Sequence, residues 1–498
     1  MNLNRIPIRP WLLAVILALA PTASAEWKEK VLYSFQGGTD GSTPAGGVVF
    51  DAAGNLYGAT EQGSGSDCKP TGYCGTVFQL KPPAKQGDPW TESVLHAFTG
   101  VTSTGHDGAV PAGGLVIDAV GNLYGTTAYG GSGDCVLAGV KGGCGTVFEL
   151  EPPLSKGGTW TYKILYSFQG SKDGYFPWGD LVFDKAGNLY GATQFGGGFG
   201  SCDSPFYQHC GTVFELSPPK TKSGKWKEKV LYSFKSGTDG ANPNGGLVFD
   251  GKGVIYGTTY SGGDNVCKGD GYVGCGTAFK LIPPLTRGEL WREKLLRSFA
   301  VGFPKYGAGP SGGLVLDAKG RLYGTTAGGG SAENGVAFRL SKSGSVWTET
   351  IMRTFENLDG RESKAGMIFD SMGNLYGAAS GGGASGDGTL FKLNRLAASA
   401  EKWSFSLLHT FTGPPDGEFP AAHLAIGTDG NLYGTTQIGG KTGCQGGCGV
   451  VYETSAGGPD FRTEDEMDFG CPTLSRSLRK GGRQRRIALA LRRRSREE

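Results

Sequence analysis

Ten of the eleven cysteines occur as five close pairs, and they are the residues best spaced to do chemistry with one another. In an exported chain, such local pairs predict disulfide bonds. Zinc is the alternative, because the last pair has nearly the spacing of a metal site, but a structural zinc needs four ligands in one cluster. Cys471 is left over, as a free thiol or an intermolecular partner. The pairs are Cys68/Cys74, Cys135/Cys144, Cys202/Cys210, Cys267/Cys275 and Cys444/Cys448.

Two series of aspartates also recur at regular intervals. One carboxylate per Asp-Gly turn is too few for a calcium cage, and Asp-Gly is ordinary turn chemistry, so we favour the turn. The second series precedes a turn glycine and predicts a structural role in hairpins, because a catalytic residue is normally needed once. The first series is Asp40, Asp107, Asp173, Asp239, Asp359 and Asp416; the second is Asp51, Asp118, Asp184, Asp250, Asp317 and Asp370.

Motifs for catalysis are missing from the sequence. It contains no serine-nucleophile elbow, HExxH zinc motif, phosphate-binding loop or dinucleotide fingerprint. The five histidines are interpreted as lying in unrelated repeat phases: His96, His106, His209, His409 and His423. We therefore assign no catalytic residue, cofactor or metal. A carboxylate pair for glycoside cleavage stays open, because the distance between two carboxyl groups in the folded protein cannot be read from the sequence.

These residues are positioned by a repeat that runs through most of the chain. Its motif reads W-x-E-x-VLYSF, a DG turn, P-x-GG-LVFD-xx-GNLYGTT, a glycine-rich loop with the cysteines, and GTVFEL-x-PP. Such self-similarity indicates a repeat architecture. The phase is marked by seven tryptophans, Trp27, Trp90, Trp160, Trp226, Trp291, Trp347 and Trp403.

Each repeat offers four short runs rich in β-branched and aromatic residues and bounded by Gly, Pro or Asp, which predict strands. Four strands per unit are typical of propeller blades; a solenoid is the alternative, but it does not need a four-strand meander. The other three strands of the repeat recur as groups of three. The first VLYSF-type strand, Val31 to Phe35, lies before the first of these groups. We therefore predict an all-β, seven-bladed β-propeller over residues 26–456, closed by the N-terminal strand completing the last blade.

The two ends differ from the repeats. Residues 1–25 have a basic start, an apolar stretch and an Ala-Ser-Ala end, which predict a cleaved signal peptide and a secreted protein. Residues 457–498 form a basic tail expected to be disordered. The body between them is mildly acidic, which argues against a nucleic-acid partner, and no later stretch is long and apolar enough to span a bilayer.

Binding is expected on the face that carries the cysteine loops and the Asp-Gly loops, near the central axis. The residues that follow the GTT run vary from copy to copy, and Tyr129, Phe195 and Tyr260 fall in consecutive copies beside Gln194 and Gln437. Aromatic rings with neighbouring amides suit flat, partly apolar ligands such as sugars. Packing against the adjoining loops is the alternative for the rings.

The motif set LVFD-xx-GNLYGTT-x-GG and GTVFEL-x-PP, with VLYSF between copies, resembles the bacterial choice-of-anchor tandem repeat proteins that contain GloVer repeats. The resemblance covers residues 27–454 and implies an exported repeat protein with no established activity, so no functional residue is carried over. We expect a noncatalytic binding or scaffold protein for polysaccharide or another surface protein. An exported hydrolase or lyase and a structural adhesion module are the alternatives.

Overall fold

The computed structural model describes the repeat region and leaves out both ends. The expected signal peptide, the expected basic tail, Cys68, Cys202 and Cys471 lie outside the described residues. The described ranges are 27–64, 74–85, 87–100, 107–137, 140–155, 157–170, 172–198, 210–221, 224–264, 267–269, 272–286, 289–300, 306–396, 402–441 and 443–456.

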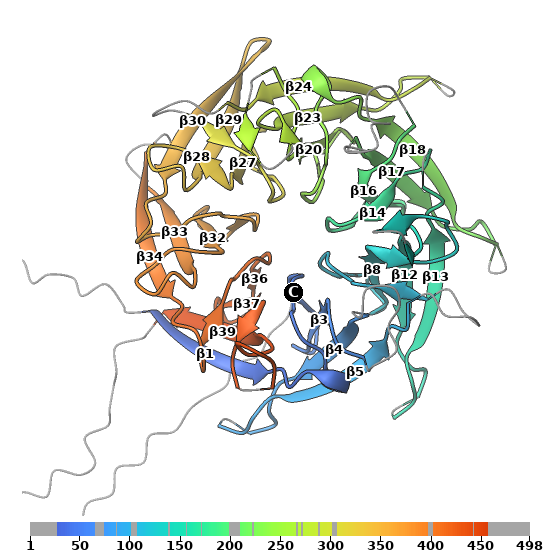
Figure 1. Cartoon of the computed structure of the whole chain (residues 1–498), viewed down its shortest axis with the longest axis vertical. Helices are drawn as coiled ribbons and strands as arrows, with labels where there is room; N and C mark the ends of the chain where they lie inside the picture. The colour runs from blue at the N-terminus through green and yellow to red at the C-terminus, as the bar shows by residue number, and fades with distance from the viewer. Residues whose placement is uncertain are drawn as a thin grey trace, which may run out of the picture. The chain divides into compact units, whose positions relative to one another are not determined.

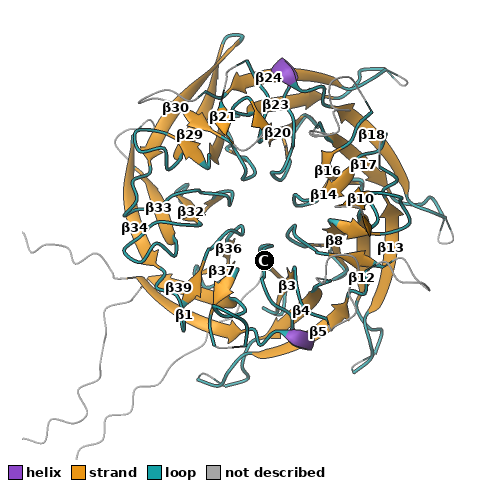
Figure 2. Ribbon diagram, viewed as in Figure 1, coloured by secondary structure: helices purple, strands orange, loops and turns teal. Residues whose placement is uncertain are grey.

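Seven antiparallel sheets stand around a common axis (Figure 1). Each sheet is one blade, with its shortest strand innermost and its longest strands outermost. Within the described residues, Figure 2 shows strands and loops with two single-turn 3-10 helices, η1 (Gly38–Asp40) and η3 (Gly237–Asp239). The predicted seven-bladed all-β propeller is confirmed.

The strands occupy four equivalent positions in the blades. The innermost are β2 (Val49–Phe50), β7 (Val116–Ile117), β15 (Val182–Phe183), β19 (Val248–Phe249), β26 (Val315–Leu316), β31 (Ile368–Phe369) and β36 (Ala425–Ile426). The second are β3 (Leu56–Thr60), β8 (Leu123–Thr127), β16 (Leu189–Phe195), β20 (Ile255–Thr259), β27 (Leu322–Thr325), β32 (Leu375–Ala379) and β37 (Leu432–Thr436). The third are β4 (Thr76–Lys81), β12 (Thr146–Glu151), β17 (Thr212–Ser217), β23 (Thr277–Ile282), β29 (Val336–Ser343), β33 (Thr389–Arg395) and β39 (Val450–Ala456). The outermost are β5 (Thr91–Ala97), β13 (Thr161–Ser167), β18 (Lys227–Ser233), β24 (Arg292–Ser298), β30 (Val346–Thr354), β34 (Trp403–Thr410) and, for blade seven, β1 (Trp27–Ser34).

The ring is closed by the N-terminal strand, as predicted. Strand β1 pairs antiparallel with β39, from Trp27 opposite Ala456 to Ser34 opposite Val450. Blade seven therefore consists of β36, β37 and β39 from the end of the repeat region and β1 from its beginning. This pairing covers the edge of β39, which would otherwise expose unpaired backbone groups.

The core lies between neighbouring blades. The phenylalanine that follows each outer strand meets the aromatic residue in the third strand of the next blade; for example, the Phe35 and Phe78 ring centroids are 5.1 Å apart. Both side chains are fully buried. A Cβ on Gly58 would lie 2.5 Å from the Phe78 ring, so only glycine fits there. Seven such interfaces tie the blades into a ring.

The strand-ending aspartates have the structural role that was predicted. Asp51 accepts hydrogen bonds at Oδ1 from the backbone N–H groups of Ala53 and Asn55, and at Oδ2 from the Asn55 amide and the Tyr57 hydroxyl. This network fixes the turn between the first two strands of the blade. Equivalent networks surround Asp118, Asp184 and Asp370.

The loop before the inner strand and the loop after the second strand share one face of each blade; they carry the Asp-Gly turns and the cysteine pairs where these occur. Ser42 pairs with Gln62 as an isolated bridge, and the same link is made by Ala241 with Ser261. In other blades short strands make it: β6 (Gly108–Ala109) with β9 (Tyr129–Gly130), β25 (Gly307–Ala308) with β28 (Gly328–Gly329), β35 (Gly417–Glu418) with β38 (Ile438–Gly439), and β14 (Tyr175–Pro177) with β16. Two further ribbons join β10 (Val136–Leu137) to β11 (Val140–Lys141) and β21 (Lys268–Gly269) to β22 (Tyr272–Val273). Among the described residues, no helix has the length and apolar character to cross a membrane.

Candidate functional site

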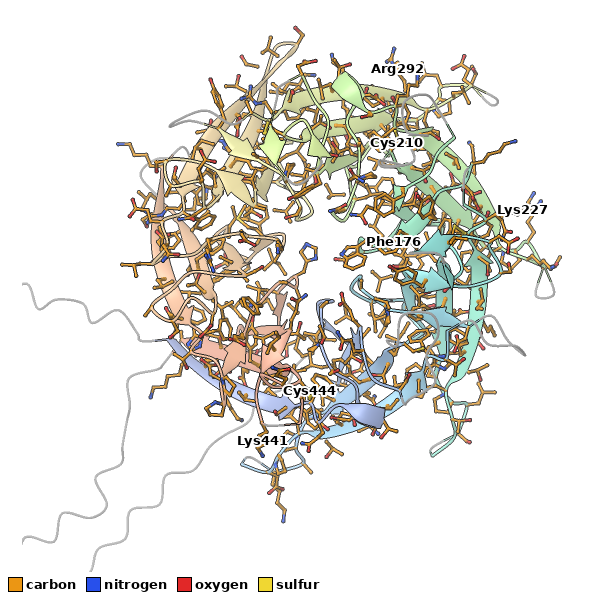
Figure 3. All side chains as sticks on the ribbon, in the orientation of Figure 1. Phe176, Cys210, Lys227, Arg292, Lys441 and Cys444 are labelled. Atoms are coloured by element: carbon orange, nitrogen blue, oxygen red, sulfur yellow. A yellow bond between two sulfur atoms is a disulfide. The ribbon has the colours of Figure 1, made fainter. Side chains whose placement is uncertain are left out.

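A cavity of about 480 Å³ opens on the axis, on the face where the cysteine and Asp-Gly loops lie. Its lining comes from equivalent positions in different blades, so residues far apart in sequence surround one space. Figure 3 shows Phe176 beside the central opening, whereas Lys227 and Arg292 lie at the outer rim. The cavity is therefore the place where differences between the repeats are brought together.

The innermost ring is the hub position, the residue two before each inner strand. Glycine occupies it in five copies; at Gly47 the neighbouring backbone approaches so closely that a Cβ would lie 2.7 Å from the His423 carbonyl oxygen. Copies three and seven carry charged residues instead. The hub residues are Gly47, Gly114, Asp180, Gly246, Gly313, Gly366 and His423.

The two charged hub residues meet across the axis. His423 Nδ1, from blade seven, lies 2.6 Å from Asp180 Oδ2, from blade three. The Gly114 backbone N–H donates to Asp180 Oδ1 at 2.6 Å, so the carboxylate is held on both oxygens. About a third of each side chain is exposed, which leaves the pair accessible from the cavity.

The hub pair shifts the pKa values of both partners. Burial alone would lower the pKa of His423, but the charge of Asp180 and its hydrogen bond raise it above the usual value. Burial alone would raise the pKa of Asp180, but His423 and the Gly114 N–H lower it. The imidazolium and carboxylate forms are therefore favoured together.

The second ring is the post-strand position, the first residue after the LYGTT-type run of each copy. Five of its seven members line the cavity: Glu61, Gln194, Tyr260, Ser380 and Gln437. Three of the five residues predicted for ligand binding, Gln194, Tyr260 and Gln437, are among them. Burial raises the pKa of the half-buried Glu61 carboxyl to about 7.

The other two predicted binding residues, Tyr129 and Phe195, are not in the cavity lining. Tyr129 packs edge-on against Phe176 with ring centroids 4.6 Å apart, and Phe195 packs against Tyr175 at 5.4 Å. Both residues lie one position beyond the post-strand ring. Side chains alternate along a strand, so this one-residue difference directs them into contacts between loops rather than into the cavity.

The third ring is the post-proline position, the residue after the proline of the loop before each inner strand; in copy six Ser363 stands in place of the proline. All of its members line the cavity: Ala45, Ala112, Trp178, Asn244, Ser311, Lys364 and Ala421. Trp178 stacks in parallel on Phe176, with ring centroids 5.6 Å apart. Lys364 Nζ lies 3.3 Å from Glu362 Oε2 in a half-exposed ion pair. This ring adds an aromatic surface, an amide, a hydroxyl and a cation to the site.

Backbone geometry behind these rings is unusual and repeated. Two residues before each post-proline position, the chain takes a left-handed conformation that is uncommon outside glycine. The residues are Thr43 (φ 58°), Val110 (58°), Phe176 (65°), Asn242 (58°), Gly309 (63°), Glu362 (54°) and Phe419 (57°).

Hydrogen bonds on both sides hold each left-handed residue. The Thr43 N–H donates to the Cys448 carbonyl at 2.9 Å, and the Thr43 carbonyl accepts from the Glu61 N–H at 3.0 Å. Val110 is held in the same way by Cys74 and Ala128. The second cysteine of one blade thus positions the cavity residues of the next blade.

The disulfide predictions are confirmed where the structure describes both partners. Cys135–Cys144, Cys267–Cys275 and Cys444–Cys448 are bonded. Cys74 and Cys210 are also disulfide-bonded, and their predicted partners, Cys68 and Cys202, lie outside the described residues.

One interpretation of the histidines was wrong. His96 and His409 occupy the same repeat position, the one filled by Tyr33 in blade seven. Each contacts the Asp-Gly aspartate that follows it: His96 Nε2 is 3.3 Å from Asp107, and His409 Nε2 is 3.2 Å from Asp416. The Asp-Gly aspartates therefore bind side chains of the outer strands as well as forming turns.

Sequence reasoning missed several residues of the site, above all Asp180, His423 and Trp178. Their signal is a departure from the repeat at a fixed position: aspartate and histidine replace glycine at the hub, and tryptophan replaces a small or polar residue after the proline. Aligning the seven copies column by column identifies these residues. That they lie around one cavity follows only from the closed ring of blades.

The model of one protein family, described as the Gloeobacter/Verrucomicrobia repeat, matches residues 134–368 and 310–473. No curated protein matches the chain. A solved structure of a carbohydrate-active enzyme of family AA12 from Trichoderma reesei is 12% identical, with 88% of this chain and 97% of that chain covered and a TM-score of 0.42. A putative oxidoreductase (glucose dehydrogenase) from Thermus thermophilus is 13% identical, covering 86% and 100%, with a TM-score of 0.39. A further glucose dehydrogenase is 14% identical, covering 86% and 99%, with a TM-score of 0.40.

Proposed function

The chain belongs to the Gloeobacter/Verrucomicrobia repeat family, and from this membership and the axial cavity we propose that it is an exported binding protein for a small polar ligand of the carbohydrate class. Export is supported by the disulfides, which persist in oxidising compartments. The N-terminal 25 residues would direct it there.

One observation carries this proposal: residues that break the repeat gather in the axial cavity. A scaffold repeated only for stability would keep glycine at every hub position and small residues after every proline. Instead, Asp180, His423, Trp178, Gln194 and Gln437 converge on one space of about 480 Å³. Convergent polar groups in a concave site are the usual mark of ligand binding.

The lining favours sugar hydroxyls. Gln194, Gln437 and Asn244 each offer both a donor and an acceptor, which matches the dual hydrogen bonding of a hydroxyl group. Trp178 and Tyr260 supply aromatic surface for the apolar face of a sugar ring. The cavity volume suits roughly one or two hexose units, so we expect the end of a glycan or a short oligosaccharide to bind.

Hydrolysis or lyase chemistry is the second candidate function. Two carboxyl groups of the cavity have pKa values moved in opposite directions: Glu61 is raised to about 7 by burial, whereas Asp180 is lowered by His423 despite its burial. Such a divided pair is the arrangement in which one carboxyl donates a proton while another stays ionised. This candidate uses the same cavity and the same ligand class.

Calorimetric titration of the full-length protein with hexoses and disaccharides, guided by a glycan array, tests the proposal. We expect binding, with an affinity at least tenfold lower in Gln437→Ala and Trp178→Ala. Leu154→Ala is the matched control, because Leu154 is fully exposed in the turn on the opposite face of its blade. Release of reducing ends or unsaturated product during the titration would support the second candidate. No binding and no turnover would contradict both and leave a structural adhesion module.

A further inference from the structure

A second repeated constellation lies at the rim, where the outer strand of each blade meets the next blade. In three copies a tyrosine hydroxyl of the outer strand donates to the Asp-Gly aspartate: Tyr33 to Asp40 at 2.7 Å, Tyr166 to Asp173 at 2.8 Å and Tyr232 to Asp239 at 2.5 Å. The outer strand of the next blade adds a glutamate near each aspartate: Glu92, Glu228 and Glu293.

The copy at the junction of blades six and seven differs. His409 replaces the tyrosine, Asp416 is the aspartate, and Glu29 on β1 is the glutamate. One ligand atom from each of the three lies within 4.8 Å of the others. No other set of three His, Cys, Asp or Glu side chains meets this condition in the described part of the chain.

We propose that Glu29, His409 and Asp416 form a binding site for a divalent transition-metal cation of the zinc type, which fastens the closing strand β1 to blade six. An imidazole nitrogen with two carboxylates is a donor set that suits zinc, whereas calcium and magnesium prefer oxygen alone. Three protein ligands would leave a fourth position for water.

The geometry needs little adjustment to hold the ion. His409 Nε2 and Asp416 Oδ2 are 3.2 Å apart, and two ligands of a tetrahedral zinc with bonds of about 2.1 Å are separated by about 3.4 Å. The Thr412 N–H and hydroxyl donate to the same aspartate oxygen at 3.1 and 3.3 Å. Such outer hydrogen bonds orient a ligating carboxylate.

One oxygen of the site is shielded from water and lacks a partner. Glu29 Oε1 has no hydrogen-bond partner among the described residues. An unpaired buried carboxylate oxygen is costly, and a cation would satisfy it. A cavity of about 710 Å³ lined by Glu29, Pro415 and Asp416 gives the ion a path of entry.

The neighbouring copies supply matched controls. His409→Tyr rebuilds the Tyr–Asp–Glu arrangement of three other copies, so it removes the nitrogen ligand with little disturbance of the fold. His96→Tyr makes the same exchange at His96–Asp107, where Tyr162 takes the place of the glutamate and stacks on His96 with centroids 4.0 Å apart. It should leave metal binding intact.

Zinc affinity of the full-length protein is measured by competition with a chromophoric chelator, and melting is followed with and without Zn²⁺. We expect one Zn²⁺ per chain at this site and a rise in melting temperature with zinc for the native protein and His96→Tyr. His409→Tyr should bind zinc at least tenfold more weakly and lose the rise, and Glu29→Gln should weaken binding as well. Equal zinc affinity and equal zinc-dependent melting in the native protein and His409→Tyr, or no binding to either, would overturn the proposal.

Discussion

His423 Nδ1 and Asp180 Oδ2 are 2.6 Å apart although the residues belong to blades seven and three. Asp180 raises the pKa of His423 above 6.5. On this side of the titration, the contribution of the pair to the stability of the fold is complete below pH 6.5 and is lost as the pH rises through the folded-state pKa of His423. On the acid side the contribution is lost as the pH falls through the lowered pKa of Asp180.

Asp180→Asn should therefore cost about 1 kcal/mol in the free energy of unfolding at pH 5.5, a modest value because partial exposure screens the pair. The cost should be smaller at pH 9, because His423 then loses its charge. It should also lower the pKa of His423, which NMR titration of the imidazole measures. The exposed Asp88→Asn serves as the control. An unchanged His423 pKa in Asp180→Asn would refute the interaction.

Ring closure by β1 can be tested with a deletion and a permutant. Removing residues 26–36 should abolish cooperative unfolding, because the edge of β39 and the interface beside Phe78 become exposed. Moving the same residues behind residue 456 through a short turn should restore it, since Trp27 lies opposite Ala456. Differential scanning calorimetry distinguishes the two. A deletion variant with the native melting temperature would contradict this account of closure.

The rim glutamates predict a loss of stability on the alkaline side. Burial, together with the aspartate of the preceding loop, raises the pKa of Glu92, Glu228 and Glu293 from 4.5 to about 7. A folded-state pKa above the unfolded value means that stability falls as the pH rises from about 4.5 through 7.

Replacing these three glutamates with glutamine should raise the melting temperature at pH 8 and change it little at pH 4, with roughly 1 kcal/mol per site after allowance for screening. Glu289→Gln, in an exposed turn, is the control. A pH profile of unfolding free energy that is the same in the triple variant and the native protein would rule the effect out.

The left-handed residues predict opposite effects of glycine at equivalent positions. Glu362→Gly should stabilise the protein by about 1 kcal/mol, because an exposed side chain is removed from a strained backbone with φ 54°. Gly309→Ala should destabilise it, since φ is 63° and a Cβ would lie 3.0 Å from the Tyr260 ring. Chemical denaturation measures both. Changes of the same sign would contradict the strain argument.

The cysteines predict a specific labelling pattern. Alkylation of the native protein followed by mass spectrometry should leave Cys135, Cys144, Cys267, Cys275, Cys444 and Cys448 unmodified until a reductant is added. The same experiment on protein made in a reducing compartment provides the comparison. Labelling of these six without reductant would argue against the disulfides and against export.

Most of the fold was predictable because its determinants are local and repeated. Alternating β-branched and aromatic residues specify each strand, and the seven tryptophans count the blades. Closure followed from one unmatched outer strand at the start of the repeats, a property of strand order that is visible in the sequence.

The candidate site was predictable only in part. The variable residues after the second strand located it, but Tyr129 and Phe195 lie one residue beyond Gln194 and its equivalents, and alternation along the strand turns them away. The contact between Asp180 and His423 depends on the width of the hub. That distance is set by the packing of seven blades, which no local pattern reports.

The hydrogen bond from the Thr43 N–H to the carbonyl of Cys448 links a disulfide to the shape of the axial cavity. Each oxidised loop anchors a backbone segment of the adjacent blade, so a thiol oxidant acting on Cys444 and Cys448 also shapes the mouth of the axial cavity around Glu61. A newly made chain whose cysteines are not yet oxidised would have a poorly formed opening to the axial cavity. For the exported binding protein proposed above, ligand capture would thereby be postponed until the disulfides have formed outside the reducing environment of synthesis.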